Sequence, residues 1–200
     1  MLDLTEIPGL LRLFCFKLVV VLDVFSRMPL AARVFFAEPS GRDVARLFAA
    51  AAKRFGPPRH CVSDQGAQFT SRVFSRTLDR LGVRHRFGAI GRAGSIAVIE
   101  RFFRTLKSIA RLPARPPLLR TDLERRLTLA FDYYAWLRPH QGLAGATPVE
   151  VCLGRRSARL DAVAPPRGRP GEWSGIPPPP FEIRYLDPEH HLPYLVRKAA

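Results

Sequence analysis

The segment CVSDQGAQF, residues 61–69, places an acid at the end of an apolar run. A short apolar run ends at Asp64, and Gly66 follows as a turn residue. This pattern predicts a strand over residues 60–63 that presents the Asp64 carboxylate at its carboxyl end. Aspartate is also common as a turn-capping residue, which is the structural alternative for Asp64. The surrounding sequence favours a catalytic role.

Two further acids accompany Asp64. Glu100 lies thirty-five intervening residues later, in SIAVIERFFRTLK (residues 95–107), and Asp3 lies in LDLTEI (residues 2–7). In the helix predicted from residue 95 to about 110, Glu100 and Lys107 are seven residues apart, so both emerge on the same face. Another face, expected to bury against the sheet, carries Ile99, Phe103, Leu106 and Ala110.

Strands alternate with helices over the first two thirds of the chain, which indicates an α/β domain. The predicted strands cover residues 13–24, 30–36, 60–63 and 83–87. The predicted helices cover residues 40–55, 71–81, 95–110 and 121–137. Ser40 is the candidate cap of the first helix, and Thr121 with Glu124 is expected to form a capping box that opens the last one. The first two strands should form a hairpin, in which Asp23 has a structural role together with Ser26 and Arg27.

The chain is strongly basic. Its net charge is +15 and its pI about 11.2, and 28 of its 32 basic residues are arginine. The planar guanidinium group binds phosphate through two donors at once. A field of this sign favours a polyanionic partner, first of all nucleic acid. The alternatives are a solvated basic surface or a codon-bias effect in a GC-rich genome.

Composition also excludes several protein classes. The three cysteines, Cys15, Cys61 and Cys152, show no metal-ligand spacing and predict reduced thiols in a cytoplasm. The apolar run over residues 18–24 is shorter than the roughly 20 residues that span a bilayer. Acidic residues replace the basic start of a signal peptide. We therefore expect a cytoplasmic protein that needs no membrane and no small-molecule cofactor.

Asp3, Asp64 and Glu100 suit metal-dependent phosphodiester chemistry. This chemistry needs an activated oxygen nucleophile, a stabilised leaving oxygen and neutralised charge at phosphorus, and two divalent cations about 3.5–4 Å apart supply all three. Mg²⁺ takes oxygen ligands, usually a few carboxylates and the phosphate oxygens of the substrate. Without the metal the carboxylates repel one another, so the metal-free site is electrostatically strained.

These segments resemble the Asp-Asp-Glu catalytic core of the retroviral-integrase-like transposases found in bacterial insertion sequences. The SDQGAQF segment is similar to the second-acid motif of that family, and IERFFRTLK to its glutamate helix with the downstream lysine. The matching segments, in chain order, are residues 22–27, 63–69, 99–107, 133–143 and 146–150. The resemblance covers about residues 2–154, with these motifs in order at compatible spacings.

The resemblance implies a ribonuclease-H-like fold, with a mixed five-stranded sheet flanked by helices. It implies that Asp3, Asp64 and Glu100 are catalytic and hold Mg²⁺ or Mn²⁺, with two ions present when DNA is bound. It also implies cleavage at transposon ends, attack of a 3′-hydroxyl on target DNA, and a homo-multimer bound across two DNA ends in a bacterial cytoplasm.

The chain is expected to divide into a catalytic core, residues 1–154, a Pro/Gly-rich linker, residues 155–180, and a short tail, residues 181–200. In the family, the first strand begins several residues before the first acid, and a helix-turn-helix region that binds transposon ends precedes it. Here the chain starts two residues before Asp3. We therefore expect a core truncated at its amino end, in which Asp3 is poorly positioned because a terminus frays unless it is tied down.

Four residues are candidate DNA contacts: Arg92, Arg104, Lys107 and His140. Lys107 late in its helix also complements the helix dipole, and His140 could equally cap a packed corner. The arginines near Arg92 could line a DNA groove or form a solvated face. Three glycines in residues 88–94 predict a mobile loop before the Glu100 helix, which suits closure over a substrate.

The function expected from these observations is that of a transposase, a metal-dependent polynucleotidyl transferase that moves a mobile element. The alternative is a catalytically inactive remnant that binds DNA or multimerises, and so regulates a full-length transposase. A ribonuclease-H-type nuclease acting on RNA–DNA hybrids is a third hypothesis that the fold allows. Lys107 and the segment at residues 138–140 argue against it.

Overall fold

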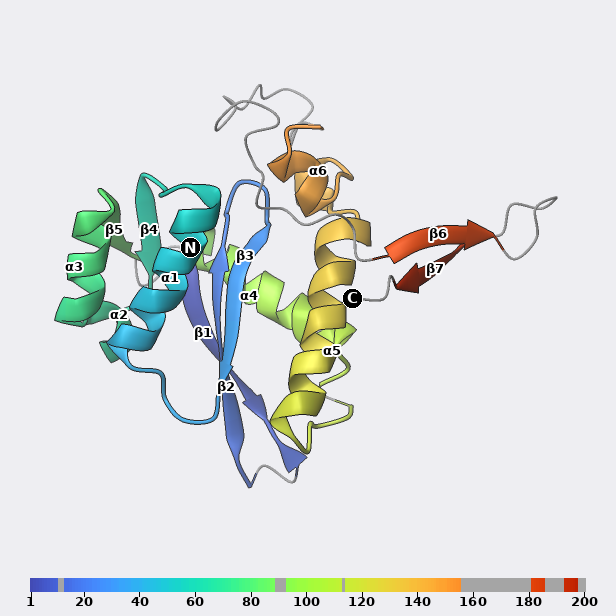
Figure 1. The fold of residues 1–200 in the computed structure, drawn as a ribbon, viewed down its shortest axis with the longest axis horizontal. Coiled ribbons are helices and arrows are strands. Elements are labelled where there is room, and N and C mark those ends of the chain that lie inside the picture. The colour runs from blue at the N-terminus through green and yellow to red at the C-terminus, as the bar shows by residue number, and fades with distance from the viewer. Residues whose placement is uncertain (11–12, 89–92, 113, 156–180, 186–192, 198–200) are drawn as a thin grey trace.

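The computed structural model describes residues 1–10, 13–88, 93–112, 114–155, 181–185 and 193–197 (Figure 1). Its strands are β1 (Leu2–Pro8), β2 (Cys15–Leu22), β3 (Pro29–Phe35), β4 (His60–Ser63), β5 (Arg84–Phe87), β6 (Phe181–Tyr185) and β7 (Pro193–Arg197). Its helices are α1 (Gly41–Phe55), α2 (Ala67–Thr70), α3 (Arg72–Arg80), α4 (Ala93–Ile109), α5 (Arg120–Asp132) and α6 (Pro148–Cys152). A π-helical turn, Tyr133–Leu137, extends α5, and a 3-10 turn covers Gln141–Leu143.

The first five strands form two sheets at the centre of the molecule. β1, β2 and β3 are antiparallel with β2 in the middle, and β4 and β5 form a parallel pair. The predicted single mixed sheet of five strands was therefore wrong: β1 and β4 lie close together, but no main-chain hydrogen bond joins them within the described ranges. Leu2 of β1 and Cys61 of β4 belong to one apolar core, so side-chain packing joins the two sheets.

Helices cover both faces of the β1–β3 sheet (Figure 1). Side chains alternate along β2, so Leu18 and Val20 pack toward α4 and α5 while Val19 and Val21 pack toward α1 and α3. The predicted apolar face of the Glu100 helix is confirmed. The first of these two cores contains Ile99, Phe103, Leu106 and Ala110, all of them buried.

The starts of the helices test the capping predictions. α1 begins after Ser40, whose hydroxyl accepts a bond from the Asp43 amide at 3.3 Å. The capping box predicted at Thr121 was wrong, because α5 begins at Arg120 and has no side-chain cap. The Glu124 carboxylate that the box required instead accepts a bond from Arg120 Nε at 2.8 Å.

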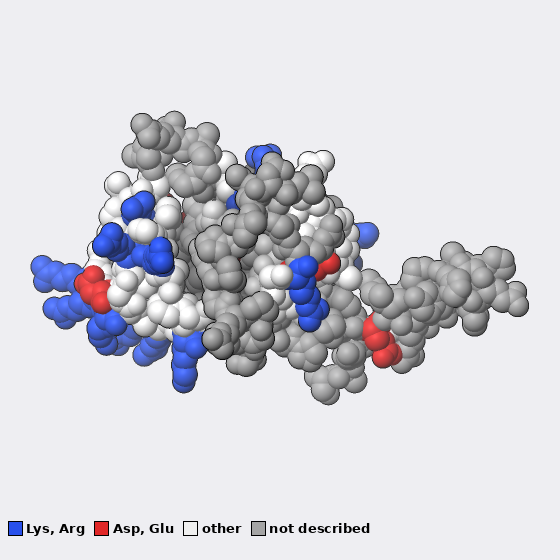
Figure 2. All heavy atoms as spheres, turned by 90° about the horizontal axis from the view of Figure 1, so that it is seen from above, with Lys and Arg blue, Asp and Glu red and all other residues white. Residues whose placement is uncertain are grey.

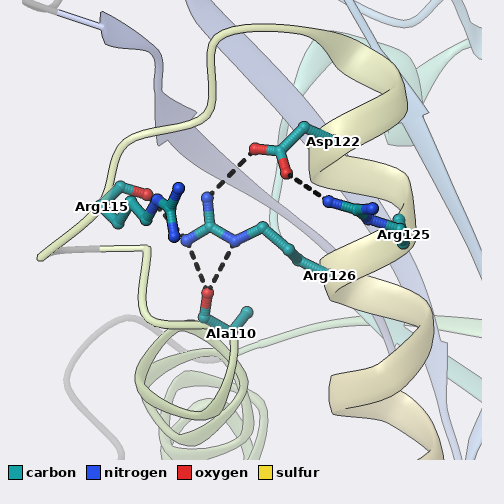
Figure 3. Close-up of polar contacts among 5 residues, drawn as sticks. All are labelled: Ala110, Arg115, Asp122, Arg125 and Arg126. Atoms are coloured by element: carbon teal, nitrogen blue, oxygen red, sulfur yellow. Dashed lines mark hydrogen bonds and ion pairs between the residues drawn. The ribbon is translucent and has the colours of Figure 1, made fainter.

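Arg126 joins the end of α4 to α5 (Figure 3). Its Nε and Nη2 donate to the carbonyl oxygen of Ala110 at 3.1 and 2.7 Å. Nη2 also donates to the carbonyl oxygen of Arg115 at 2.7 Å, and Nη1 to Asp122 Oδ2 at 3.3 Å. The last carbonyls of a helix have no intrahelical partner, so this fork satisfies one of them. We call these residues, together with Arg125, the α4–α5 corner.

The remaining fold predictions concern the hairpin turn and the carboxyl end. The structural role predicted for Asp23 is confirmed, since its Oδ2 accepts bonds from the amide and hydroxyl of Ser26 at 2.9 and 2.7 Å. The tail, for which the sequence shows some strand character, contains the antiparallel pair β6–β7. Residues 156–180, most of the predicted linker, lie outside the described residues, and the domain division stays a prediction. Within the described part of the chain, no helix has the length and apolarity to cross a membrane.

Candidate active site

Asp64 lies where the sequence places it, directly after β4. Its Oδ1 accepts a hydrogen bond from the Gly66 amide at 3.0 Å, which makes the turn that the structural alternative predicted. The side chain is nevertheless exposed, and no described residue engages its second carboxylate oxygen. The turn therefore orients Asp64 and leaves an oxygen available to a ligand.

Asp3 lies inside a paired strand, so the β1–β2 ladder ties down its backbone near the chain's first residue. It is opposite Val20 in the β1–β2 ladder, which the Leu22 amide extends by donating to the Met1 carbonyl at 2.8 Å. Asp3 Oδ1 accepts a bond from the Leu4 amide at 2.8 Å. The ladder fixes the Asp3 backbone, and side-chain alternation places its carboxyl on the sheet face that packs against α4.

The three candidate acids, Asp3, Asp64 and Glu100, lie in one electrostatic neighbourhood, which we call the acidic site. Burial raises the pKa of Asp3 from 3.8 to about 6, the bond from the Leu4 amide opposes this rise, and the charges of Asp64 and Glu100 add to it. Glu100 itself is exposed on α4, next to the fully buried Ile99. The fold thus brings together acids from β1, from the end of β4 and from α4.

The acidic site matches a hard divalent cation in the chemistry of its donors. Carboxylate oxygens are the ligands that Mg²⁺ prefers. Burial is the main cause of the raised Asp3 pKa, and a cation would relieve the repulsion from Asp64 and Glu100 that adds to it. Across the described ranges, however, no three His, Cys, Asp or Glu side chains are gathered closely enough to hold one ion. The acids are neighbours in an open arrangement.

A polar pair behind Asp64, the buried Ser63 and the half-buried His85, was missed by the sequence analysis. The Ser63 hydroxyl donates to the Asp64 carbonyl at 2.8 Å and lies 2.9 Å from His85 Nε2. Because a hydroxyl has one proton, we assign the His85 proton to Nε2, which then donates to Ser63. The ring of His85 packs edge-on against Phe74, with centroids 5.4 Å apart, and burial lowers its pKa. The two residues become neighbours through the register of β5 against β4, in which His85 is opposite Cys61. The sequence pattern within either strand does not contain this register.

Lys107 contacts β1. Its Nζ donates to the Thr5 hydroxyl at 2.7 Å, and burial lowers the lysine pKa while the Glu6 charge opposes this shift. Thr5 follows Asp3 by two residues and so lies on the same face of β1. Lys107 thus fixes α4 against the strand that carries Asp3, and its role as a DNA contact stays a prediction.

The other candidate DNA contacts differ in position. His140 lies within a packed corner: its Nε2 is 3.4 Å from the Tyr134 carbonyl, and its ring meets Tyr134 edge-on with centroids 4.6 Å apart. This favours the capping alternative for His140. Arg104 is exposed on α4, and Arg92 lies outside the described residues.

Part of the chain is similar to known sequences. The profile of the integrase core domain family matches residues 2–93, a range that includes Asp3 and Asp64 but not Glu100. An uncharacterized protein of Caenorhabditis elegans is 31% identical over 102 residues, which cover 50% of this chain. The matched segment is only 8% of that protein, so the chain spans a small part of this curated relative.

Comparisons with solved structures show the fold. The catalytic core domain of BIV integrase gives a TM-score of 0.58 at 22% identity and covers 77% of this chain and 93% of its own. The catalytic core domain of HTLV-2 integrase, solved with magnesium in a dimeric form, gives 0.58 at 19% identity and covers 76% and 94%. A chain of the simian T-cell lymphotropic virus intasome gives 0.64 at 16% identity and covers 98% and 75%. The chain therefore has the ribonuclease-H-like fold of retroviral integrase cores.

Proposed function

We propose that this chain is a polynucleotidyl transferase of the integrase core type, which cuts and joins DNA of a mobile element. The observation that carries the proposal is the acidic site. Asp3 and Asp64 lie inside the segment that matches the integrase core domain, and their charges act on each other. Glu100 lies beyond that segment and is included because its charge also reaches Asp3.

In this proposal Asp3, Asp64 and Glu100 hold Mg²⁺ or Mn²⁺. The ions, when bound, neutralise charge at the phosphorus and activate the attacking oxygen. The Gly66 amide orients the Asp64 carboxylate, and the Ser63 hydroxyl holds its backbone. The magnesium present in the HTLV-2 structure supports the choice of metal. The dimeric form of that protein supports a multimer, and the net charge of +15 supports DNA as the partner.

One observation favours a second candidate function. Since the described acids do not gather around one point, the chain could bind DNA without cleaving it and so regulate a full-length transposase. The two candidates share the DNA partner and differ in whether a divalent ion completes the acidic site. Metal binding and catalysis therefore have to be measured separately from DNA binding.

The test uses the variants Asp64→Asn and Glu100→Gln, with Asp79→Asn on α3 as the control. We expect each of the first two to lower the rate of strand transfer on branched DNA in Mn²⁺ on the order of 10³-fold or more. When catalytic residues act together, the loss of one removes most of the activity that the set provides. The control should keep its activity. Calorimetric titration should show saturable Mn²⁺ binding that Asp64→Asn loses and Asp79→Asn retains.

Activity near that of the wild type in either acidic-site variant would sink the catalytic assignment. A folded wild-type chain that binds DNA but neither binds Mn²⁺ nor transfers strands would establish the second candidate instead. Circular dichroism of each variant shows whether a loss arises from unfolding.

A further inference from the structure

Helix α3 carries a row of arginines that the acidic site does not use. Its inner face is anchored by Phe74 and Leu78, both fully buried. Its outer face carries Arg72, Arg76 and Arg80, all exposed. At four-residue spacing these positions are about 6 Å apart along the helix axis and differ by about 40° in direction. They therefore form one row about 12 Å long, which we call the α3 stripe.

The charge of the α3 stripe is not neutralised within the described part of the chain. None of its three arginines forms an ion pair there, and neither does Asp79, the acid on the same helix. Arg80 Nε donates to the Arg76 carbonyl at 3.2 Å, and this bond leaves the two terminal nitrogens of Arg80 unused by described residues. A set of three positive charges is thus held on a rigid element with its donors exposed.

The surroundings of α3 reinforce this charge. Residues 40–88 contain ten Lys and Arg against three Asp and Glu. Figure 2 shows Lys and Arg side chains gathered at the end of the molecule where α1 and α3 lie. A surface of one sign raises the local concentration of an oppositely charged partner.

The composition of the exposed face indicates which polyanion it suits. The exposed residues of α3 are Arg72, Val73, Arg76, Asp79 and Arg80. None is aromatic, so the helix offers no platform on which unpaired bases could stack. Arginine forks bind phosphate oxygens, and a 12 Å length of DNA duplex carries about seven phosphate charges. The stripe therefore suits the backbone of a duplex better than a single strand.

We propose that the α3 stripe is a DNA-contacting surface, distinct from the acidic site, which holds the phosphate backbone of duplex DNA. The proposal rests on the proposed function, because the polyanion is taken to be the DNA on which the acidic site acts. α3 follows Asp64 through the short α2, and Ser71 caps it by accepting a bond from the Phe74 amide at 3.3 Å. Duplex held on the stripe is thus tied to an element that continues directly from the acidic site.

The test measures binding of a labelled 30-base-pair duplex to the full 200-residue chain in EDTA, so that no cleavage occurs. Fluorescence anisotropy is recorded between 50 and 200 mM salt. The variant Arg72→Gln/Arg76→Gln/Arg80→Gln should bind about tenfold or more weakly at 50 mM, and the slope of log K against log salt should fall by about 2–3, since each phosphate contact contributes about 0.9.

A matched control removes the same charge elsewhere. Arg120→Gln/Arg125→Gln/Arg155→Gln changes three exposed arginines near α5 and α6, two of them paired with carboxylates, and should weaken binding less than about threefold. The variant with lysine at all three α3 positions keeps the charge and should keep both affinity and slope. Thermal melts should coincide for the α3 variants and stay within a few degrees for the control, because none of these arginines is buried and only the control breaks exposed ion pairs.

The outcomes separate this proposal from the proposed function. Equal weakening in the glutamine variant and the control would overturn the α3 stripe, because only the net charge would then matter. Tighter binding of an RNA duplex or of single-stranded DNA than of duplex DNA would overturn it as well. A folded wild-type chain that binds no DNA at 50 mM salt would overturn the proposed function, and the stripe with it.

Discussion

The α4–α5 corner pairs its charged side chain with oxygen acceptors, whereas the acidic site places like charges near one another. Both regions adjoin α4. In the corner, each nitrogen of the Arg126 guanidinium has an oxygen acceptor, so four of the five N–H donors of a partly buried charge are hydrogen-bonded (Figure 3). In the acidic site, Asp3 is partly buried beside two like charges, and its pKa rises to about 6. The first arrangement stabilises the fold. The second opposes it, as is common where residues are kept for chemistry.

The largest effect on stability should follow from breaking the corner. Arg126→Ala leaves the Ala110 and Arg115 carbonyls and the Asp122 carboxylate without the fork. We expect a loss of about 2–4 kcal/mol in the free energy of unfolding, measured with urea, since hydrogen bonds to charged groups contribute about 1.5–3 kcal/mol each and part of the site rehydrates.

Arg125→Ala is the matched control for the corner. Arg125 lies one residue earlier, its side chain is 76% exposed against 15% for Arg126, and its distance to Asp122 is 3.6 Å. An exposed pair of this kind contributes within about 1 kcal/mol. Equal losses in the two variants would show that the additional hydrogen bonds of Arg126 contribute no more stability than an exposed ion pair does.

The next effect should have the opposite sign. Asp3→Asn removes the carboxylate with the raised pKa and should increase the free energy of unfolding at pH 7.5 in EDTA by about 1–3 kcal/mol, because one pKa unit corresponds to about 1.4 kcal/mol. The same substitution should abolish strand transfer. A stabilised but inactive variant would mark Asp3 as a residue kept for function.

The pH dependence gives a second check on Asp3. Its folded pKa of about 6 lies above 3.8, so between these values the folded state holds a proton that the unfolded state has lost. Wild-type stability therefore falls as pH rises from about 4 to 6, and the gain from Asp3→Asn should appear across that window. A gain that is as large at pH 3.5 as at pH 7.5 would contradict the assignment.

The smallest stability effect concerns the pair behind Asp64. His85→Leu removes the donor to Ser63 and should lower the free energy of unfolding by about 1–2 kcal/mol. His85→Gln, whose amide can reach a position like that of Nε2, should recover part of it. If the pair positions Asp64, Mn²⁺ affinity should follow the same order, wild type above His85→Gln above His85→Leu. Unchanged metal affinity in a folded His85→Leu variant would reduce the pair to a packing role.

Local patterns in the sequence predicted most of the elements. The Ser40 cap, the short strand before Asp64 and the apolar face of α4 each depend on neighbours within about one or two helical turns or one strand. The same kind of reasoning failed at Thr121. Glu124 forms a hydrogen bond with Arg120 in place of the predicted capping bond. The capping pattern considers only Thr121 and Glu124, so it could not predict this alternative partner.

The contacts that define the candidate site were less accessible to sequence reasoning. The bond from Lys107 to Thr5 spans 102 positions, and the pair of Ser63 with His85 spans 22. Both depend on which strands and helices become neighbours, and periodicity within one segment contains no such information. The chemical types of Asp3, Asp64 and Glu100 could be inferred from sequence, while their environments could not.

The Lys107–Thr5 bond also has a consequence for how the molecule assembles. Closing a flexible loop of about 100 residues carries an entropic cost of about 4 kcal/mol, far above that of the hairpins that join β1 to β2 and β2 to β3. Asp3 and Glu100 therefore belong to the least local part of the topology. The acidic site forms only when the whole core is folded. Binding of any ligand that needs all three acids therefore also measures the fraction of molecules in which the entire domain is folded.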